Sequence, residues 1–191
     1  EYRLSINGKN INSKKIDLES LKNNFNEKEI VCTIQCAGNR RNELNSIETT
    51  LGLPWNGGAI SNGKWKGVLL KDLLIDCGFN KDNYTGDEHI QFIGTDQPFD
   101  ASISIRKIFD DNSDILVAYE MNDSDLYPDH GYPVRIVVPG YFGGKQVKWL
   151  NEIRIDDEES KSTWQRGVAY KLLPSFIKNI EDIKKIDIIK I

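Results

Sequence analysis

Residues 29–41, EIVCTIQCAGNRR, join a β-rich run to a turn of small residues and two arginines. The β-branched residues of the run and the glycine at Gly38 predict a strand that ends in a tight turn. Positive charge beside the Cys36 thiol stabilises the thiolate, which is the form that binds metals or attacks electrophiles. Arg40 and Arg41 also suit an oxyanion or a phosphate. The alternative is a buried cysteine beside a solvated turn, and this stretch alone leaves both interpretations open.

Outward from this stretch, short strands outnumber helices. We expect strands over residues 2–7, 29–36, 89–94, 114–120, 134–138 and 147–155. Helices are expected over 17–25 and 67–77, and residues 101–109 fit either a strand or a helix. Glycine-bearing loops are expected over 56–67, 128–133 and 139–144. This order is not a regular alternation of strand and helix, which argues against a Rossmann-type sheet. The sequence therefore predicts an α+β fold with mixed β-sheets and short helices.

Composition excludes several classes of protein. The chain has 191 residues, 39% of them hydrophobic, and a formal net charge of −4. That length predicts one domain, and the acidic balance argues against a nucleic-acid partner. No apolar run approaches the roughly 18 residues of a membrane span. Three Cys and two His are too few for a disulfide scaffold and too scattered for a four-ligand zinc site. Cys32 lies too far from Cys36 along one strand to bridge to it, and Cys77 falls on an apolar helical stripe, so both are expected in the core.

A second cationic stretch, residues 129–148, surrounds an apolar strand and several glycines with His130, Arg135, Lys145 and Lys148. Cations beside glycines that bare their backbone N–H groups can form an anion cradle. The alternative is a hairpin with ordinary surface lysines.

Several pieces occur in an order that resembles the molybdopterin-binding domain of the sulfite oxidase family. They are IQCAGNRR (34–41), GAISNGKW (58–65), AYEMN (118–122), DHGYPVRIVVPG (129–140), KQVKWL (145–150) and WQR (164–166). The assimilatory nitrate reductases share much of this pattern, but the glutamine before Cys36 and the sequence of residues 58–65 are more similar to the sulfite oxidases.

The resemblance implies a molybdenum cofactor, with one pyranopterin whose dithiolene holds the metal together with two oxo groups. Cys36 would be the protein's thiolate ligand to the metal, since soft sulfur ligands suit a redox metal. The other catalytic positions implied are Arg41, Trp55 and Tyr170, and the cofactor-binding positions implied besides Cys36 are Arg40, Asp96, His130, Arg135, Gln146, Val147 and Lys148. The spacing from WQR to Tyr170 is one residue longer than the family pattern.

The implied reaction is the two-electron oxidation of sulfite to sulfate by oxo transfer, with an electron acceptor such as a cytochrome or oxygen. Two family features are not found in these residues: a Phe-x-Arg-Asn-His segment before Cys36, and a dimerisation domain that would make the full-length protein a homodimer. We therefore expect a catalytic domain over residues 1–175 and a C-terminal segment over 176–191. The alternatives are a nitrate reductase-type enzyme, or a truncated domain that binds the pterin or a partner without turnover.

Overall fold

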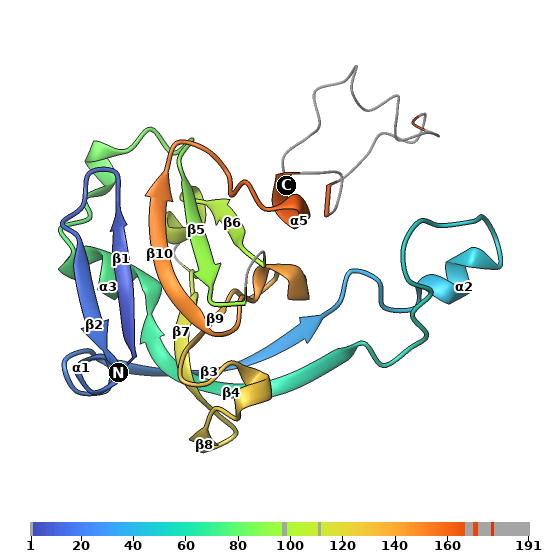
Figure 1. Cartoon of the computed structure of the whole chain (residues 1–191), viewed down its shortest axis with the longest axis horizontal. Helices are drawn as coiled ribbons and strands as arrows, with labels where there is room; N and C mark the ends of the chain where they lie inside the picture. Colours follow the sequence, from blue (N-terminus) through green and yellow to red (C-terminus); the bar gives the residue numbers. More distant parts are fainter. Residues whose placement is uncertain (1, 97–98, 111, 167–169, 172–176, 178–191) are drawn as a thin grey trace.

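The computed structural model describes residues 2–96, 99–110, 112–166, 170–171 and 177 (Figure 1). Its strands are β1 (Arg3–Gly8), β2 (Lys14–Asp17), β3 (Glu27–Gln35), β4 (Ile60–Leu69), β5 (His89–Gly94), β6 (Ala101–Ser104), β7 (Leu116–Met121), β8 (Ser124–Asp125), β9 (Arg135–Val137) and β10 (Leu150–Asp156). Its α-helices are α1 (Leu18–Asn23), α2 (Arg41–Asn45), α3 (Leu70–Asp76), α4 (Arg106–Phe109) and α5 (Thr163–Arg166), and its 3-10 turns are η1 (Lys81–Asn83), η2 (Pro128–His130) and η3 (Gly143–Lys145).

Within the described residues the strands form two sheets. One runs in the order β2–β1–β10–β5–β6, and the other runs β3–β4–β7–β8 with β9 paired to β7. β1 and β10 pair in parallel, whereas β10 and β5 pair antiparallel. Mixed sheets with short helices confirm the predicted α+β class.

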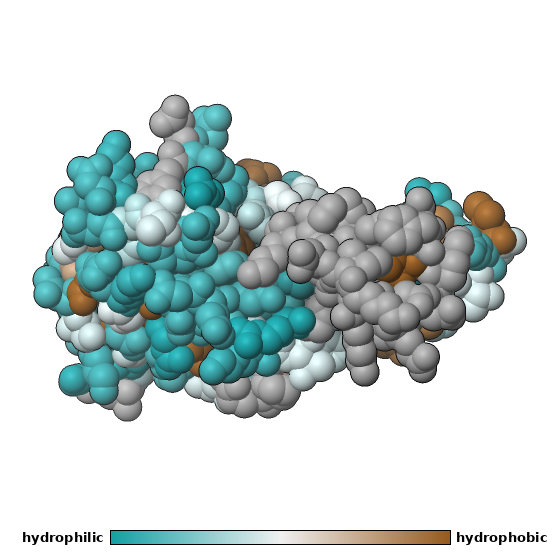
Figure 2. All heavy atoms as spheres, turned by 90° about the horizontal axis from the view of Figure 1, so that it is seen from above, coloured by the Kyte–Doolittle hydropathy of each residue, from teal (hydrophilic) through white to brown (hydrophobic). Residues whose placement is uncertain are grey.

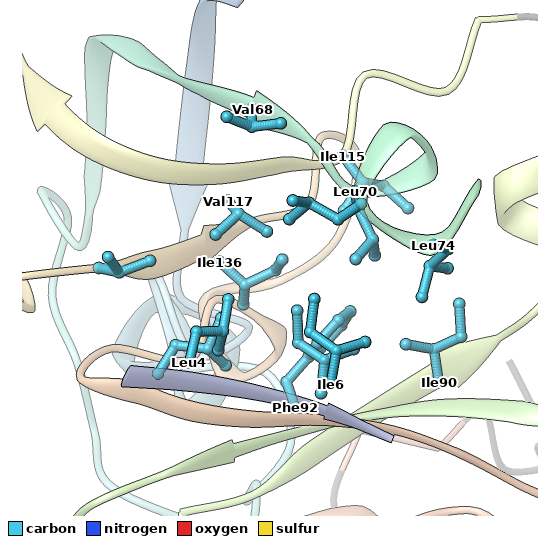
Figure 3. Packing of buried hydrophobic residues seen from close by; sticks show 14 of the residues in the cluster. Leu4, Ile6, Val68, Leu70, Leu74, Ile90, Phe92, Ile115, Val117 and Ile136 are labelled. Carbon is cyan, nitrogen blue, oxygen red and sulfur yellow. The ribbon is translucent and has the colours of Figure 1, made fainter. Parts of the chain in front are cut away.

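The main core lies between the two sheets. Figure 3 shows Leu4 and Phe92 from one sheet facing Val68 and Val117 from the other, and all four side chains are fully buried. Burying a side chain of this size contributes about 1.5–3 kcal/mol, so this layer supplies much of the folding free energy. The core expected around Cys77 is confirmed.

β3 and β4 form a long antiparallel ribbon. They pair from Glu27 opposite Val68 to Gln35 opposite Ile60. In Figure 1 this ribbon reaches away from the rest of the described chain and ends at α2. Cys36 is therefore the first residue beyond the ribbon, and Cys32 within it is buried as expected.

The loop expected over residues 56–67 is wrong from Ile60 onward, because β4 begins there. The expected helix over 67–77 correspondingly starts only at Leu70. Gly67 explains the error: a Cβ at this position would lie 2.1 Å from the Val117 carbonyl oxygen. This glycine permits close strand approach and does not mark a loop.

Other boundaries also differ from the expectations. β2 was not predicted, and residues 101–109 hold both alternatives in succession, a strand and then α4. The expected boundary at residue 175 and the segment 176–191 lie outside the described residues, apart from Ile177. Among the helices that the structure describes, none combines the length and the apolar character that a membrane crossing requires.

Candidate functional site

Cys36 lies where the ribbon opens into the connection to β4, which we call the ribbon end (residues 36–59). Its backbone N–H donates to the Ala59 carbonyl at 2.9 Å, so the ladder holds its Cα in place. The Gly38 N–H lies 3.4 Å from the Cys36 sulfur. The thiol is half-buried, so it is partly open to solvent. Cys36 is therefore placed as an accessible soft ligand.

Arg41 and Trp55 both pack against the backbone of Gly38. A Cβ built there would lie 2.8 Å from Arg41 Nη2 and 2.8 Å from Trp55 Cδ1. Arg41 Nη1 donates to the Leu53 carbonyl at 2.8 Å, which folds the guanidinium back along the ribbon end. The absent side chain at Gly38 thus brings a guanidinium and an indole together two residues from Cys36.

Arg40 has a different environment. Its backbone is left-handed, with φ of 64°, and it precedes the first residue of α2. Its guanidinium binds the Glu43 carboxylate in bidentate fashion, with donor–acceptor distances of 2.9 and 2.5 Å, and both side chains are exposed. The structure therefore places Arg40 in a surface ion pair.

Tyr170, which is distant in the sequence, lies close to the ribbon end. Its ring rests on Gly144, where a Cβ would lie 2.7 Å from the ring Cζ and 2.9 Å from the hydroxyl oxygen. Burial raises the pKa of the Tyr170 phenol, the nearby Cys36 raises it further, and the Arg41 guanidinium opposes both. The thiol and the guanidinium are therefore both within electrostatic reach of the phenol.

A cavity of about 400 Å³ opens beside Tyr170. It is lined by Asp96, Phe99, Asp100, Gly143, Gly144, Gln146, Val147, Lys148, Trp149, Trp164 and Tyr170. Five of these were predicted site residues: Asp96, Gln146, Val147, Lys148 and Tyr170. The volume lies within the range of cofactor pockets, about 300–1,000 Å³.

We call residues 134–150 the cavity wall. The polar side chains Arg135, Lys145 and Gln146 of this wall are buried and hydrogen-bonded. The Gln146 amide accepts from the Val138 N–H at 2.6 Å and donates to the Val138 carbonyl at 2.7 Å. Arg135 donates to the carbonyls of His130 at 3.0 Å and Gln146 at 3.2 Å, and its guanidinium stacks 4.7 Å from the Trp65 ring centroid. Burial lowers the pKa of Arg135 to about 10.

His130 lies beside this wall, and Lys148 forms its half-buried edge. Lys148 Nζ donates to the Asp129 carbonyl at 2.8 Å and lies 4.2 Å from the centroid of the Trp149 ring. His130 is exposed and meets Tyr127 edge to face at 6.3 Å. Arg135 donates to the backbone carbonyls of both His130 and Gln146, which holds the loop of His130 against the wall.

The residues present fit the cofactor that the family resemblance implies. Arg135 Nε is a buried donor with no hydrogen-bond partner among the described residues. Lys148 and the glycine N–H groups of η3 are further donors for an anion, since exposed amides and cations together bind phosphate. Cys36 supplies the soft sulfur that a redox metal prefers.

Sequence reasoning missed a group of buried polar residues behind the cavity. Lys145 donates to the side-chain oxygen of Gln165, Gln165 donates to Glu159 at 2.9 Å, and Lys171 pairs with Glu159 at 2.8 Å. It also missed the parallel stack of Phe99 on Trp164, 6.0 Å between centroids, at the cavity. Polar residues beside Trp164 and Tyr170 in the matched motifs were the available signal.

Comparison with known proteins gives a consistent result. The family described as "Oxidoreductase molybdopterin binding domain" matches residues 1–164. Sulfite oxidase of Gallus gallus is 41% identical over 171 residues, which cover 87% of this chain and 37% of that protein. Nitrate reductase (NADH) 1 of Phaseolus vulgaris is 37% identical over 167 residues, covering 84% of this chain and 19% of that protein.

Among solved structures, the sulfane dehydrogenase SoxCD of Paracoccus pantotrophus matches with a TM-score of 0.71 and 28% identity. The match covers 91% of this chain and 42% of that one. The chain spans 37% and 33% of the sulfite oxidases of Gallus gallus and Drosophila melanogaster, respectively.

Proposed function

The chain belongs to the oxidoreductase molybdopterin-binding domain family, and from that premise we propose that it is the cofactor-binding part of an enzyme that oxidises sulfite to sulfate. The observation that carries the proposal is that Tyr170, which lines the cavity, interacts electrostatically with both Cys36 and Arg41. A thiolate for a soft metal, a fixed positive charge and a protonated phenol are the groups that oxidation of a small oxyanion needs.

When bound, the molybdenum cofactor supplies two-electron redox chemistry with transfer of an oxygen atom. Cys36 would hold the metal through its sulfur, which lies 3.4 Å from the Gly38 N–H. Lys148 and Arg135 bind the anionic part of the pterin, and Asp96 and Val147 line the cavity that receives it. His130 and Gln146 hold the backbone around the cavity wall in place. Arg40 supports the ribbon end through its ion pair with Glu43.

Arg41 and Trp55 form the substrate side of the site. The net charge of the chain is −4, so sulfite must be drawn by a local cation against the overall field. Arg41 commits one donor to Leu53, and its guanidinium has five N–H donors in all, which suits bidentate binding of an oxyanion. Tyr170 remains protonated at neutral pH because its pKa is raised, so its hydroxyl donates a hydrogen bond to the substrate.

The full-length protein is proposed to pass its electrons to an acceptor such as a cytochrome or oxygen, and to act as a homodimer. Domain limits of 1–175 and 176–191 belong to the same proposal.

Metal analysis followed by two parallel assays tests the function. The purified chain is expected to carry about one molybdenum and one pterin, and the loaded full-length enzyme to reduce an acceptor when sulfite is added. Nitrate reduction without sulfite oxidation would favour the nitrate reductase-type alternative, which the Phaseolus relative keeps open. A folded chain that binds neither molybdenum nor pterin would contradict the proposal and favour a non-catalytic domain.

A further inference from the structure

The polar residues behind the cavity, Lys145, Glu159, Gln165 and Lys171, form a buried polar network that the proposed reaction does not use. Glu159, Gln165 and Lys145 are 9%, 3% and 8% exposed. Buried charged groups are rare unless they are paired, and each of these has a defined partner. Such a network rigidifies what it joins, because every member that moves leaves another unsatisfied.

Glu159 is the centre of this network. Burial opposes the charge on its carboxyl, yet hydrogen bonds from Lys171 and Gln165, together with the positive charge of Lys171 and the nearby His89, outweigh burial, and the pKa of Glu159 is lowered. The Lys171–Glu159 pair has side-chain exposures of 5% and 11%, unlike the surface pairs of this chain. Gln165 also accepts from the Ser102 N–H at 3.1 Å, which connects the network to β6.

Two residues near Tyr170 are connected to this carboxylate, Lys171 directly and Lys145 through Gln165. Lys171 is the next residue in the chain after Tyr170, whose backbone is left-handed with φ of 58°. Lys145 directly follows Gly144, on which the Tyr170 ring rests, and binds Gln165. The tyrosine and the surface beneath it are thus connected to Glu159 from two directions.

We propose that Glu159 is a positioning residue that holds the Tyr170 hydroxyl at the site of Cys36 and Arg41, acting through Lys171 and through Gln165 and Lys145. The part assigned to Tyr170 rests on the proposed function, whereas the positioning itself does not require turnover. Loss of the carboxylate leaves Lys171 without its buried partner, so the left-handed backbone at Tyr170 loses its nearest ion pair.

The test labels the seven tyrosines of the whole chain with 3-fluorotyrosine and follows Tyr170 by ¹⁹F NMR, with Tyr170→Phe identifying its resonance. Glu159→Gln and Lys171→Gln are each expected to shift and broaden this resonance, while the tyrosines remote from the network, such as Tyr2 and Tyr84, stay unchanged. Because loss of the Glu159 carboxylate already removes the Lys171 partner, the double variant should move the resonance no further than Glu159→Gln alone. Glu158→Gln is the matched control, since Glu158 pairs with Arg166 at 2.6 Å on the exposed surface.

An unmoved Tyr170 resonance in Glu159→Gln, an equal shift in Glu158→Gln, or additive shifts in the double variant would overturn the positioning role. If Glu159→Gln does not fold, Lys171→Gln decides by the same criterion. In the loaded full-length enzyme, Glu159→Gln is expected to lower kcat about tenfold at unchanged KM and molybdenum content, because small misplacements are costly. Loss of molybdenum in its place would assign Glu159 to the cofactor. A parent enzyme without sulfite oxidation would remove the proposed function and leave the resonance result standing.

Discussion

The ribbon end and the cavity wall meet at one site but are built differently. In the ribbon end, short hydrogen bonds across the connection hold Cys36 and Arg41, while large apolar side chains face outward: Leu44, Ile47, Leu51 and Leu53 are 57%, 86%, 74% and 68% exposed. Figure 2 shows hydrophobic atoms gathered at the end of the molecule where Figure 1 places α2. In the cavity wall, by contrast, Arg135, Lys145 and Gln146 are almost completely buried.

This difference in burial predicts different effects of substitutions on activity and on stability in the two regions. A buried polar group left without its partner costs about 1–3 kcal/mol, whereas surface substitutions usually stay within about 0.5 kcal/mol. Substitutions in the ribbon end should therefore change the reaction and spare the fold. Substitutions in the cavity wall should change both stability and cofactor retention.

The largest expected effect is that of Cys36→Ser, which should remove measurable sulfite turnover from the loaded full-length enzyme. A hydroxyl is a poor soft ligand, and the half-buried position of Cys36 makes the unfolding free energy nearly unchanged. Turnover assays and denaturant titration measure the two quantities. Cys32→Ser is the control, because that buried thiol lies in the smaller core cluster and should lower stability while turnover continues. Normal turnover and an unchanged metal spectrum in Cys36→Ser would exclude Cys36 from the site.

Arg41→Gln should raise the KM for sulfite by one and a half to more than three orders of magnitude, since truncating a charged contact costs about 2–5 kcal/mol. Molybdenum content should stay at the level of the parent. Arg41→Lys should also impair binding, because a flexible point charge cannot reproduce the planar guanidinium that packs on Gly38. If the glutamine variant keeps its KM and loses molybdenum, Arg41 serves the cofactor and the division between the two regions fails there.

In the cavity wall, Arg135→Ala should lower the unfolding free energy by about 3 kcal/mol, because it removes two hydrogen bonds from a charged donor. Pterin and molybdenum content should fall with it. Lys148→Ala, at the half-buried edge of the same wall, should lower cofactor occupancy about tenfold with little loss of stability. Denaturant titration and metal analysis of both variants measure this contrast. Unchanged cofactor content in both would contradict the anion-cradle role.

The same contrast explains what the sequence could predict. Cys36, Gly38 and Arg41 lie within six residues, so local chemistry marked them as candidates, and the family resemblance supplied the roles of Cys36 and Arg41. The prediction of a loop at Gly67 is wrong because the Val117 carbonyl, whose close approach requires a glycine there, lies 50 residues away in the chain and is not visible from the local sequence. The Glu159 network likewise joins residues that only folding brings together, and a lysine in a motif looks the same whether its ammonium is buried or solvated.

The smallest expected effect concerns pH and Lys145. Burial and the nearby Lys171 ammonium lower the pKa of Lys145 to about 8, against the attraction of Glu159. In the unfolded chain this lysine has its ordinary pKa of about 10.4, so above pH 8 the unfolded state binds more protons than the folded state. Stability from this group therefore rises with pH between 8 and 10.4, and below pH 8 the full cost of the buried charge is present.

Lys145→Met removes that dependence while keeping the length of the side chain. Because one pKa unit corresponds to about 1.36 kcal/mol, the parent should gain on the order of 2 kcal/mol relative to Lys145→Met between pH 8 and about 9.5. Urea titrations of both proteins at several pH values measure this difference. Lys9→Met is the control: Lys9 pairs with Asp157 at 2.5 Å at the surface, and its raised pKa produces no such gain in this range. Parallel pH profiles for the parent and Lys145→Met would show that the ammonium is solvated, and the cavity wall would then differ less from the ribbon end than its burial indicates.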